Sequence, residues 1–318
     1  MSLKRTIQHS LRKSKSFLRT GSIVSENLTK VREALRTPCP DKFDSAIFNF
    51  TIDFELLWGN GNLGGSDHSR ERRLTSASFQ KQNFKPFLDM LSELGVDISW
   101  AIIGKLADHD ILPSEQESFR PDWSKTNWYD DSFKSEDDLL WNGEYYLKYI
   151  KENFPTHEVM SHGHHHIDFF DKSVTLDVAQ WDMITGIKSL RNFGFEVDGF
   201  VYPCNKQGYF ELLKENSILI IRGSDNSWKL DTNPIQTPIG FWISPAFMSA
   251  AEIINLIDIA VEKKSFFHPW MHLNECDLSQ NDIENFYRPI FKHVVKLQNE
   301  NKIKNLSFRK IAQVLSRN

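Results

Sequence analysis

The feature that most constrains the fold is a regular alternation of short apolar segments with longer segments of helical periodicity, from about residue 43 onward. The apolar segments are rich in β-branched and aromatic residues, as buried strands are. Such alternation predicts an α/β fold, a mostly parallel sheet or barrel flanked by helices, whose sites gather at the carboxyl ends of the strands. The expected strands are 46–54, 96–103, 159–160, 199–202, 218–221 and 265–269, and the expected helices are 76–94, 139–153, 174–192, 209–215, 249–263 and 282–300.

Composition excludes several classes of protein. The 318 residues include 38 basic and 42 acidic side chains, and this balance argues against a global nucleic-acid-binding surface. Cys39, Cys204 and Cys276 share no close spacing, so neither a disulfide framework nor a CxxC zinc site is expected. No apolar run reaches the length of a membrane span, and the amino terminus lacks the apolar core of a secretory signal. A reducing, cytoplasmic setting is the simplest prediction.

The amino-terminal segment carries its own charge pattern. Residues 1–40 hold nine Lys or Arg and two Glu, a net charge of +7. We therefore expect a basic segment over residues 1–42 and a catalytic domain over residues 43–318. Three interpretations of residues 1–36 stay open: a basic amphipathic helix in peripheral contact with the inner membrane face, an organellar targeting peptide, or a solvated tail.

Two carboxylates follow the first apolar run. Asp53 and Glu55 are two residues apart, so on an extended strand both side chains point to the same face. Burying two carboxylates together is costly without a proton, a cation or a metal ion. Either a metal-linked pair or two solvated acids at the end of a strand fits this pattern.

A histidine cluster follows the third expected strand. Four histidines occur within residues 162–166, and His162 and His166 are four apart, which suits one tight turn facing a single metal ion. A weaker pair, His268 and His272, ends the aromatic strand at residues 265–269. Two histidines and one carboxylate would make a three-ligand site with open positions, as in catalytic zinc sites. With a second carboxylate to accept a proton from water and a distant histidine to protonate a leaving group, this inventory fits hydrolysis of an amide or ester.

These segments, in this order, resemble the polysaccharide deacetylases of the NodB-homology type, carbohydrate esterase family 4. The resemblance extends over roughly residues 43–314. The segments that carry it are TIDFE at 51–55, LSELGVDISWAIIG at 91–104, HEVMSHGHHHIDF at 157–169, GFVYPCN at 199–205, HPWMH at 268–272 and LSFRKIAQVL at 306–315.

The resemblance implies a distorted (β/α)7 barrel and metal-dependent removal of an acyl group from an N-acetylated sugar. Carried over by position, Asp53 would be the general base, His272 the general acid, and Glu55, His162 and His166 the ligands of a divalent metal, most simply Zn²⁺. The backbone N–H of Cys204 would help to bind the oxyanion. We expect the substrate-binding surface to include the residues Cys204, Tyr202, Trp270 and His268.

One departure concerns an arginine. Val201 stands where the family has the arginine that orients its catalytic aspartate. Arg222, at the end of the next expected strand, is the candidate substitute, although an exposed salt bridge would also explain it.

The prediction is therefore a metal-dependent N-deacetylase acting on a carbohydrate. The alternatives are a glycan-binding pseudoenzyme of the same fold and a linear-amide hydrolase with a non-sugar substrate.

Overall fold

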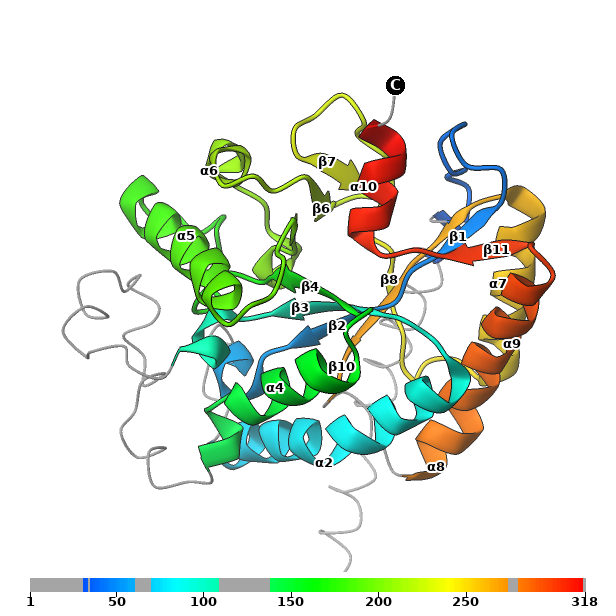
Figure 1. The fold of residues 1–318 in the computed structure, drawn as a ribbon, viewed down its shortest axis with the longest axis horizontal. Helices are drawn as coiled ribbons and strands as arrows, with labels where there is room; N and C mark the ends of the chain where they lie inside the picture. Colours follow the sequence, from blue (N-terminus) through cyan, green and yellow to red (C-terminus); the bar gives the residue numbers. More distant parts are fainter. Residues whose placement is uncertain (1–30, 34, 61–69, 109–137, 274–279, 317–318) are drawn as a thin grey trace, which may run out of the picture.

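The computed structural model describes residues 31–33, 35–60, 70–108, 138–273 and 280–316, and its centre is a sheet of eight parallel strands (Figure 1). Each strand is short, and the central strands are fully buried, as the apolar runs predict. In spatial order the strands are β7 (Ile235–Thr237), β6 (Ile220–Arg222), β5 (Gly199–Phe200), β4 (Glu158–Ser161), β3 (Ser99–Ile102), β2 (Thr51–Phe54), β10 (Pro269–His272) and β8 (Phe241–Trp242).

The sheet curls until its two edges approach each other. The edge strands β7 and β8 are consecutive in the chain, and only residues 238–240 lie between them. Four peptide steps span at most about 14 Å, so the two edges must lie close together. The predicted α/β class and the distorted barrel of parallel strands are thereby confirmed. Strands β7 and β8 were not predicted, because runs of three and two residues are too short to show a periodicity.

A smaller parallel sheet continues two of these strands. It contains β1 (Ala46–Phe48) between β11 (Ile303–Asn305) and β9 (Phe266–Phe267). The single strand predicted over 46–54 is therefore wrong in detail, since β1 and β2 pair with different neighbours. The break falls at Asn49, whose side-chain amide donates to Ser99 Oγ at 3.0 Å and to the Leu306 carbonyl at 2.7 Å. The strand predicted over 265–269 breaks in the same way, at His268.

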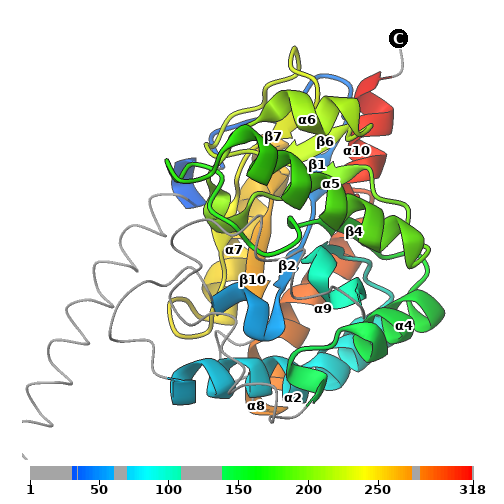
Figure 2. The same ribbon diagram turned by 90° about the vertical axis from the view of Figure 1, so that its left-hand side faces the viewer.

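Helices surround the strands on the outside (Figure 2). The helix predicted over 282–300 is interrupted by a π-helical turn, η7 (Ile283–Tyr287), because Pro289 has no N–H to donate to the Asn285 carbonyl. The α-helices are α2 (Arg70–Leu94), α4 (Glu144–Asn153), α5 (Leu176–Asn192), α6 (Phe210–Glu215), α7 (Ala250–Lys263), α8 (Gln280–Asp282), α9 (Arg288–Asn299) and α10 (Phe308–Ser316). Three short 3-10 helices follow strands, namely η1 (Leu56–Asn60), η2 (Gly104–Ala107) and η6 (Pro203–Asn205), and η5 (Asp138–Leu140) precedes α4.

Helix α10 closes the amino-terminal end of the barrel. Its Phe308 packs in one cluster with inward-facing strand residues such as Met160 and Ile220. The buried Glu158 carboxylate accepts the backbone N–H groups of Phe308 at 2.8 Å and Arg309 at 2.6 Å, which satisfies donors that the first turn of a helix leaves unpaired. A plugged amino end leaves the carboxyl ends of the strands as the side on which a site can form.

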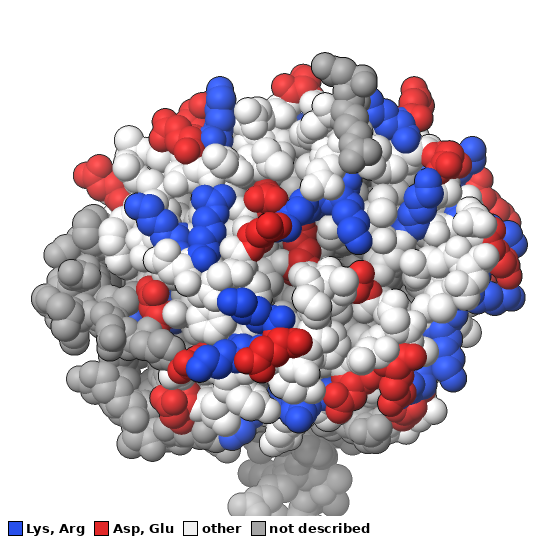
Figure 3. Space-filling model, in the orientation of Figure 1, with Lys and Arg blue, Asp and Glu red and all other residues white. Residues whose placement is uncertain are grey.

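The described residues before Phe43, which are 31–33 and 35–42, include side chains that pack against this barrel. Val31 and Leu35 are buried in the main hydrophobic core, so the described packed unit includes residues before Phe43, where the sequence placed its start. The basic segment predicted over 1–42 lies mostly outside the described residues. Within the described part of the chain, no helix has the length and apolar character needed to cross a bilayer. On the face seen in Figure 3, basic and acidic side chains are intermixed.

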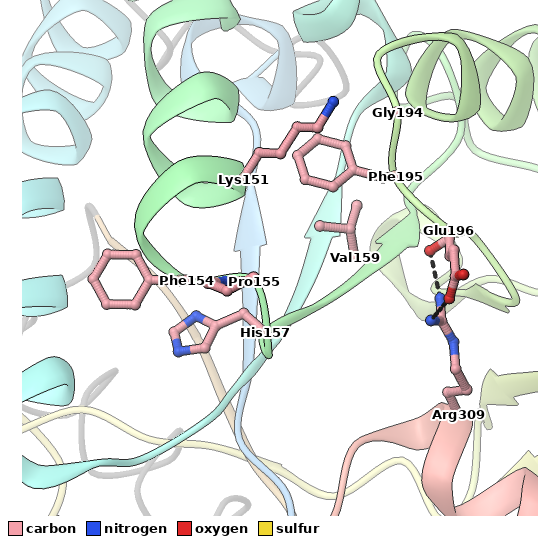
Figure 4. A pocket seen from close by; sticks show the side chains of 9 residues that line it. All are labelled: Lys151, Phe154, Pro155, His157, Val159, Gly194, Phe195, Glu196 and Arg309. Atoms are coloured by element: carbon pink, nitrogen blue, oxygen red, sulfur yellow. Dashed lines mark hydrogen bonds and ion pairs between the residues drawn. The ribbon is translucent and has the colours of Figure 1, made fainter.

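A groove lies near the amino-terminal end of β4, away from the strand carboxyl ends. It has a volume of about 320 Å³ and lies between the end of α4, the segment after α5 and the start of α10 (Figure 4). Its two cations already have partners: Lys151 donates to the Phe193 carbonyl, and Arg309 pairs with Glu196. The groove is lined by Lys151, Phe154, Pro155, His157, Val159, Gly194, Phe195, Glu196 and Arg309.

Candidate active site

Three strands bring the predicted site residues to one end of the barrel. Asp53 lies in β2, in register with His272 of the adjacent parallel strand β10, so the two side chains lie side by side. Glu55 directly follows β2, and His162 directly follows β4. Residues far apart in the sequence therefore meet because parallel strands end at the same edge of the sheet.

Glu55 lies at the centre of a histidine cluster. Its Oε1 atom lies 3.2 Å from Nε2 of His162, 3.0 Å from Nε2 of His166 and 3.3 Å from Nε2 of His272. The ligand atoms of Glu55, His162 and His166 all lie within 4.8 Å of one another, and all three side chains are buried. Burial raises the pKa of Glu55, but the nearby charges of His166 and His272 outweigh it and hold that pKa well below its usual range.

The hydrogen bonding of His162 tests whether a cation fits there. Its Nδ1 lies 2.7 Å from the Val201 carbonyl, which can only accept, so Nδ1 carries the proton. In the neutral ring, Nε2 then directs a lone pair at Glu55 Oε1, 3.2 Å away. Two acceptors at this distance repel each other unless a proton or a metal ion lies between them. Two imidazoles and a carboxylate suit Zn²⁺ and similar divalent ions, so the residues present fit the predicted metal.

The loop after β4 directs both histidines inward. Gly163 and His166 have left-handed backbone angles, with φ of +74° and +56°. The buried Asp182 carboxylate of α5 accepts the backbone N–H groups of His164 at 2.8 Å and His165 at 2.9 Å. Asp182 thereby holds the loop in shape, and His162 and His166 face one point.

Asp53 forms a two-pronged ion pair with Arg222. Arg222 Nη1 donates to Oδ1 at 2.8 Å and Nη2 donates to Oδ2 at 2.7 Å, and both residues are about 2% exposed. Burial raises the pKa of Asp53, but the charge of Arg222 and its hydrogen bonds to the carboxylate hold that pKa below its ordinary value. The exposed salt bridge considered for Arg222 from the sequence is therefore wrong: the guanidinium points into the barrel.

The residues predicted to bind substrate divide into two groups. Cys204 is exposed in η6, and Trp270 is half-buried next to His272, with 6.1 Å between the ring centroids. In contrast, Tyr202 and His268 are enclosed. The Tyr202 hydroxyl donates to the Gly208 carbonyl, and His268 Nε2 lies 2.7 Å from Thr51 Oγ1. The Tyr202 ring packs in the main hydrophobic core and the His268 ring stacks on Phe266, so neither side chain presents an open surface to a substrate.

Two residues that support the candidate site, Gly59 and Asp182, were not predicted from the sequence. Gly59 lies against Glu55, so a Cβ atom at residue 59 would lie 1.6 Å from Glu55 Oε2. Asp182 lies in the middle of helix α5, between Trp181 and Met183. Its only sequence signal is position, since an acid on the buried face of an amphipathic helix needs a partner.

Comparisons with known proteins agree with the fold. A Mycobacterium smegmatis protein assigned to the polysaccharide deacetylases aligns with a TM-score of 0.59 at 13% identity, over 88% of this chain and 93% of that one. A Pseudomonas aeruginosa PAO1 protein with the same assignment gives a TM-score of 0.56 at 9% identity, over 85% and 91% of the two chains. The PuuE allantoinase gives 0.56 at 9% identity, over 87% and 91%. No protein-family model and no curated protein sequence matches the chain.

The fold and the buried cluster of histidines and carboxylates define an α/β barrel with a candidate hydrolytic site. More specifically, the chain has the NodB-homology fold of the polysaccharide deacetylases, which confirms the resemblance at the level of the fold.

Proposed function

We propose that this protein is a metal-dependent hydrolase that removes an acyl group from an N-acylated sugar. The observation that carries the proposal is the meeting of Glu55, His162 and His166 at one point, beside a base candidate paired with Arg222. Glu55, His162 and His166 would hold the metal, and zinc is the ion that we propose. A bound divalent ion would supply positive charge that polarises the amide carbonyl and acidifies a water molecule.

The chain's own residues would carry the proton transfers. Asp53, kept ionised by Arg222, accepts a proton from the attacking water as its oxygen bonds to the carbonyl carbon. His272, in register with Asp53 on the adjacent strand, donates a proton to the amide nitrogen as the C–N bond breaks. The products are a carboxylic acid and the free amine. The exposed Cys204 would contact the substrate through its backbone N–H.

A second candidate is hydrolysis of a non-sugar amide. The structural similarity to an allantoinase supports this alternative. Its TM-score of 0.56 equals the TM-score to the Pseudomonas aeruginosa protein assigned to the polysaccharide deacetylases. The pseudoenzyme alternative depended on the missing arginine at Val201. The ion pair between Arg222 and Asp53 removes this reason, because a cation does reach the base.

Metal analysis combined with product assays tests the proposal. We expect about one divalent ion per chain, lost in His166→Ala, and release of acetate from an N-acetylated sugar panel. In Asp53→Asn we expect acetate release to fall by about 10²–10⁴-fold while the metal stays bound. Metal without acetate release, but with hydrolysis of allantoin or linear amides, would establish the second candidate. Bound metal with no turnover of any substrate would contradict both proposed hydrolytic activities. The glycan-binding pseudoenzyme would then be the remaining alternative.

The same proposal includes the location of the protein and its contact with a membrane. We propose a cytoplasmic protein whose basic residues 1–36 contact an anionic membrane surface peripherally, with the catalytic domain over 43–318 following that segment. Deleting residues 1–30 should then reduce binding to vesicles that contain anionic lipid. Equal binding by the shortened chain would contradict the membrane contact.

A further inference from the structure

Arg222 reaches Asp53 from a strand other than the one expected. Strands β5 and β6 pair in parallel with Phe200 opposite Ile221, and this register, continued by one residue, sets Val201 beside Arg222. The arginine thus lies one strand further from β2 than the position at which the family resemblance expects it. A long side chain that crosses the barrel has several rotatable bonds, so its orientation must be restrained by its neighbours.

Asn205 restrains the edge of the guanidinium. Arg222 Nε donates to Asn205 Oδ1 at 3.0 Å, in the plane that also contains the two nitrogen atoms facing Asp53. Asn205 lies in η6 with φ of +55°, directly after Cys204 with φ of +56°. Two adjacent left-handed residues without glycine are unusual, and Asn tolerates this conformation better than most residues. The strained turn is what brings the Asn205 side chain to Arg222.

Trp270 restrains the same guanidinium group from a second element. The Arg222 Cζ atom lies 5.0 Å from the Trp270 ring centroid, within the range of a cation–π contact. Trp270 is in β10, so it approaches Arg222 from a different element than Asn205 does. These two contacts from different elements leave the guanidinium few orientations, and the observed one directs both of its Nη atoms at Asp53.

We propose that Asn205 and Trp270 are positioning residues that orient Asp53 through Arg222. For Trp270, this role replaces stacking on a sugar ring. The activity tests rest on the proposed function, whereas the structural test does not. Each residue restrains a different motion, so loss of either one should loosen the carboxylate without removing any group that touches the substrate.

The structural test follows the Arg222 Nε–H signal by ¹⁵N NMR, assigned by its loss in Arg222→Lys. Asn205→Gly removes the acceptor and keeps a residue that accepts a left-handed backbone, whereas Asn205→Asp keeps the acceptor. We expect hydrogen exchange at Nε to quicken about 10-fold or more in Asn205→Gly and to stay near wild type in Asn205→Asp. This tenfold change corresponds to about 1.4 kcal/mol.

Gln207→Ala is the matched control, because Gln207 donates to the Arg222 backbone carbonyl and not to the guanidinium. We expect it to leave the exchange rate unchanged. An unchanged rate in Asn205→Gly would overturn the assignment of Asn205, whether or not the protein turns over any substrate.

The kinetic test separates positioning from substrate binding. Asn205→Gly and Trp270→Leu should lower kcat by about 10-fold or more, with KM within about twofold of wild type, because small misplacements of a catalytic group are costly. Trp270→Phe, which keeps an aromatic face, should recover much of that loss. In an Arg222→Lys background the Asn205→Gly loss should shrink. A large rise in KM with unchanged kcat in Trp270→Leu would instead mean that Trp270 stacks on the substrate. Absence of wild-type turnover would contradict the proposed function and leave the NMR test standing.

Discussion

Arg222 and Asp53 lie on strands that three other strands separate within the sheet, yet their side chains form a two-pronged ion pair at 2.7 and 2.8 Å. Such a contact is only possible across the interior of a curled sheet. The pair therefore links opposite walls of the barrel just below the candidate metal ligands, and the curl and the site depend on each other.

The first prediction concerns this buried pair. Arg222→Met leaves the Asp53 carboxylate buried without its partner, so we expect the free energy of unfolding to fall by about 3–5 kcal/mol. The double variant Asp53→Leu with Arg222→Met should recover much of this loss, because neither charge is then buried. Urea unfolding of the two variants and the wild type measures the difference.

Arg288→Met is the control for that series. Arg288 pairs with Glu93 and Glu284 near the surface, and such pairs contribute less than about 1 kcal/mol. Losses of equal size in Arg222→Met and Arg288→Met would show that the interior pair is no more important than a surface one.

The second prediction concerns Gly59. A Cβ atom at this residue would lie 1.6 Å from Glu55 Oε2, so Gly59→Ala must displace the carboxylate. We expect the affinity for Zn²⁺, measured by competition with a chelator, to fall about 10-fold or more. Gly95→Ala is the control: it has open space around it and a φ of +64°, so it should lower stability without changing Zn²⁺ affinity. Unchanged affinity in Gly59→Ala would count against Glu55 as a ligand.

The third prediction concerns Asp182. Its two carboxylate oxygens accept the backbone N–H groups of His164 and His165, and in Asp182→Asn an amide NH₂ must face one of these donors. The loop that carries His162 and His166 should loosen, and Zn²⁺ affinity should fall by about 10-fold, as is usual for residues that support metal ligands. Asp177→Asn, in the exposed first turn of the same helix, should leave the affinity unchanged. Equal affinities of both variants would mean that the loop holds its shape without Asp182.

The fourth prediction is a pH dependence of stability. Burial lowers the pKa of His157 to about 4, and the Trp100 indole N–H donates to its Nδ1 at 3.2 Å, which requires the neutral ring. Between about pH 6.5 and 4 the unfolded chain binds this proton and the folded protein does not, so stability falls as the pH falls through that window. The full effect is at most about 3 kcal/mol. His157→Gln should reduce the difference between the unfolding free energies at pH 7 and pH 4.5.

A non-titrating neighbour provides the comparison for His157. Phe195 lines the same groove as His157 (Figure 4). The variant Phe195→Leu should lower the free energy of unfolding by the same amount at both pH values. If His157→Gln kept the whole wild-type difference between the two pH values, the acid sensitivity would come from other groups.

Much of the fold was predictable because it depends on local pattern. Apolar β-branched runs and helical periodicity located most of the strands and helices. Polar residues at the ends of strands marked Asp53, Glu55 and His162. The weakest predictions were those of substrate contacts. His268 and Tyr202 stand beside motif residues in the sequence, but both side chains are buried in the folded protein. Proximity in the sequence does not reveal which way a side chain faces at the end of a strand.

The sequence by itself determined the α/β class, the carboxyl ends of the strands as the place of the site, and the residue types fit for a divalent metal, because all three follow from neighbours in the chain. The tertiary structure alone decided that Arg222 reaches Asp53, that Asp182 holds the histidine loop, and that Gly59 makes room for Glu55. Each of these contacts joins side chains from separate elements, and the direction of a side chain across a barrel is set by how the sheet curls.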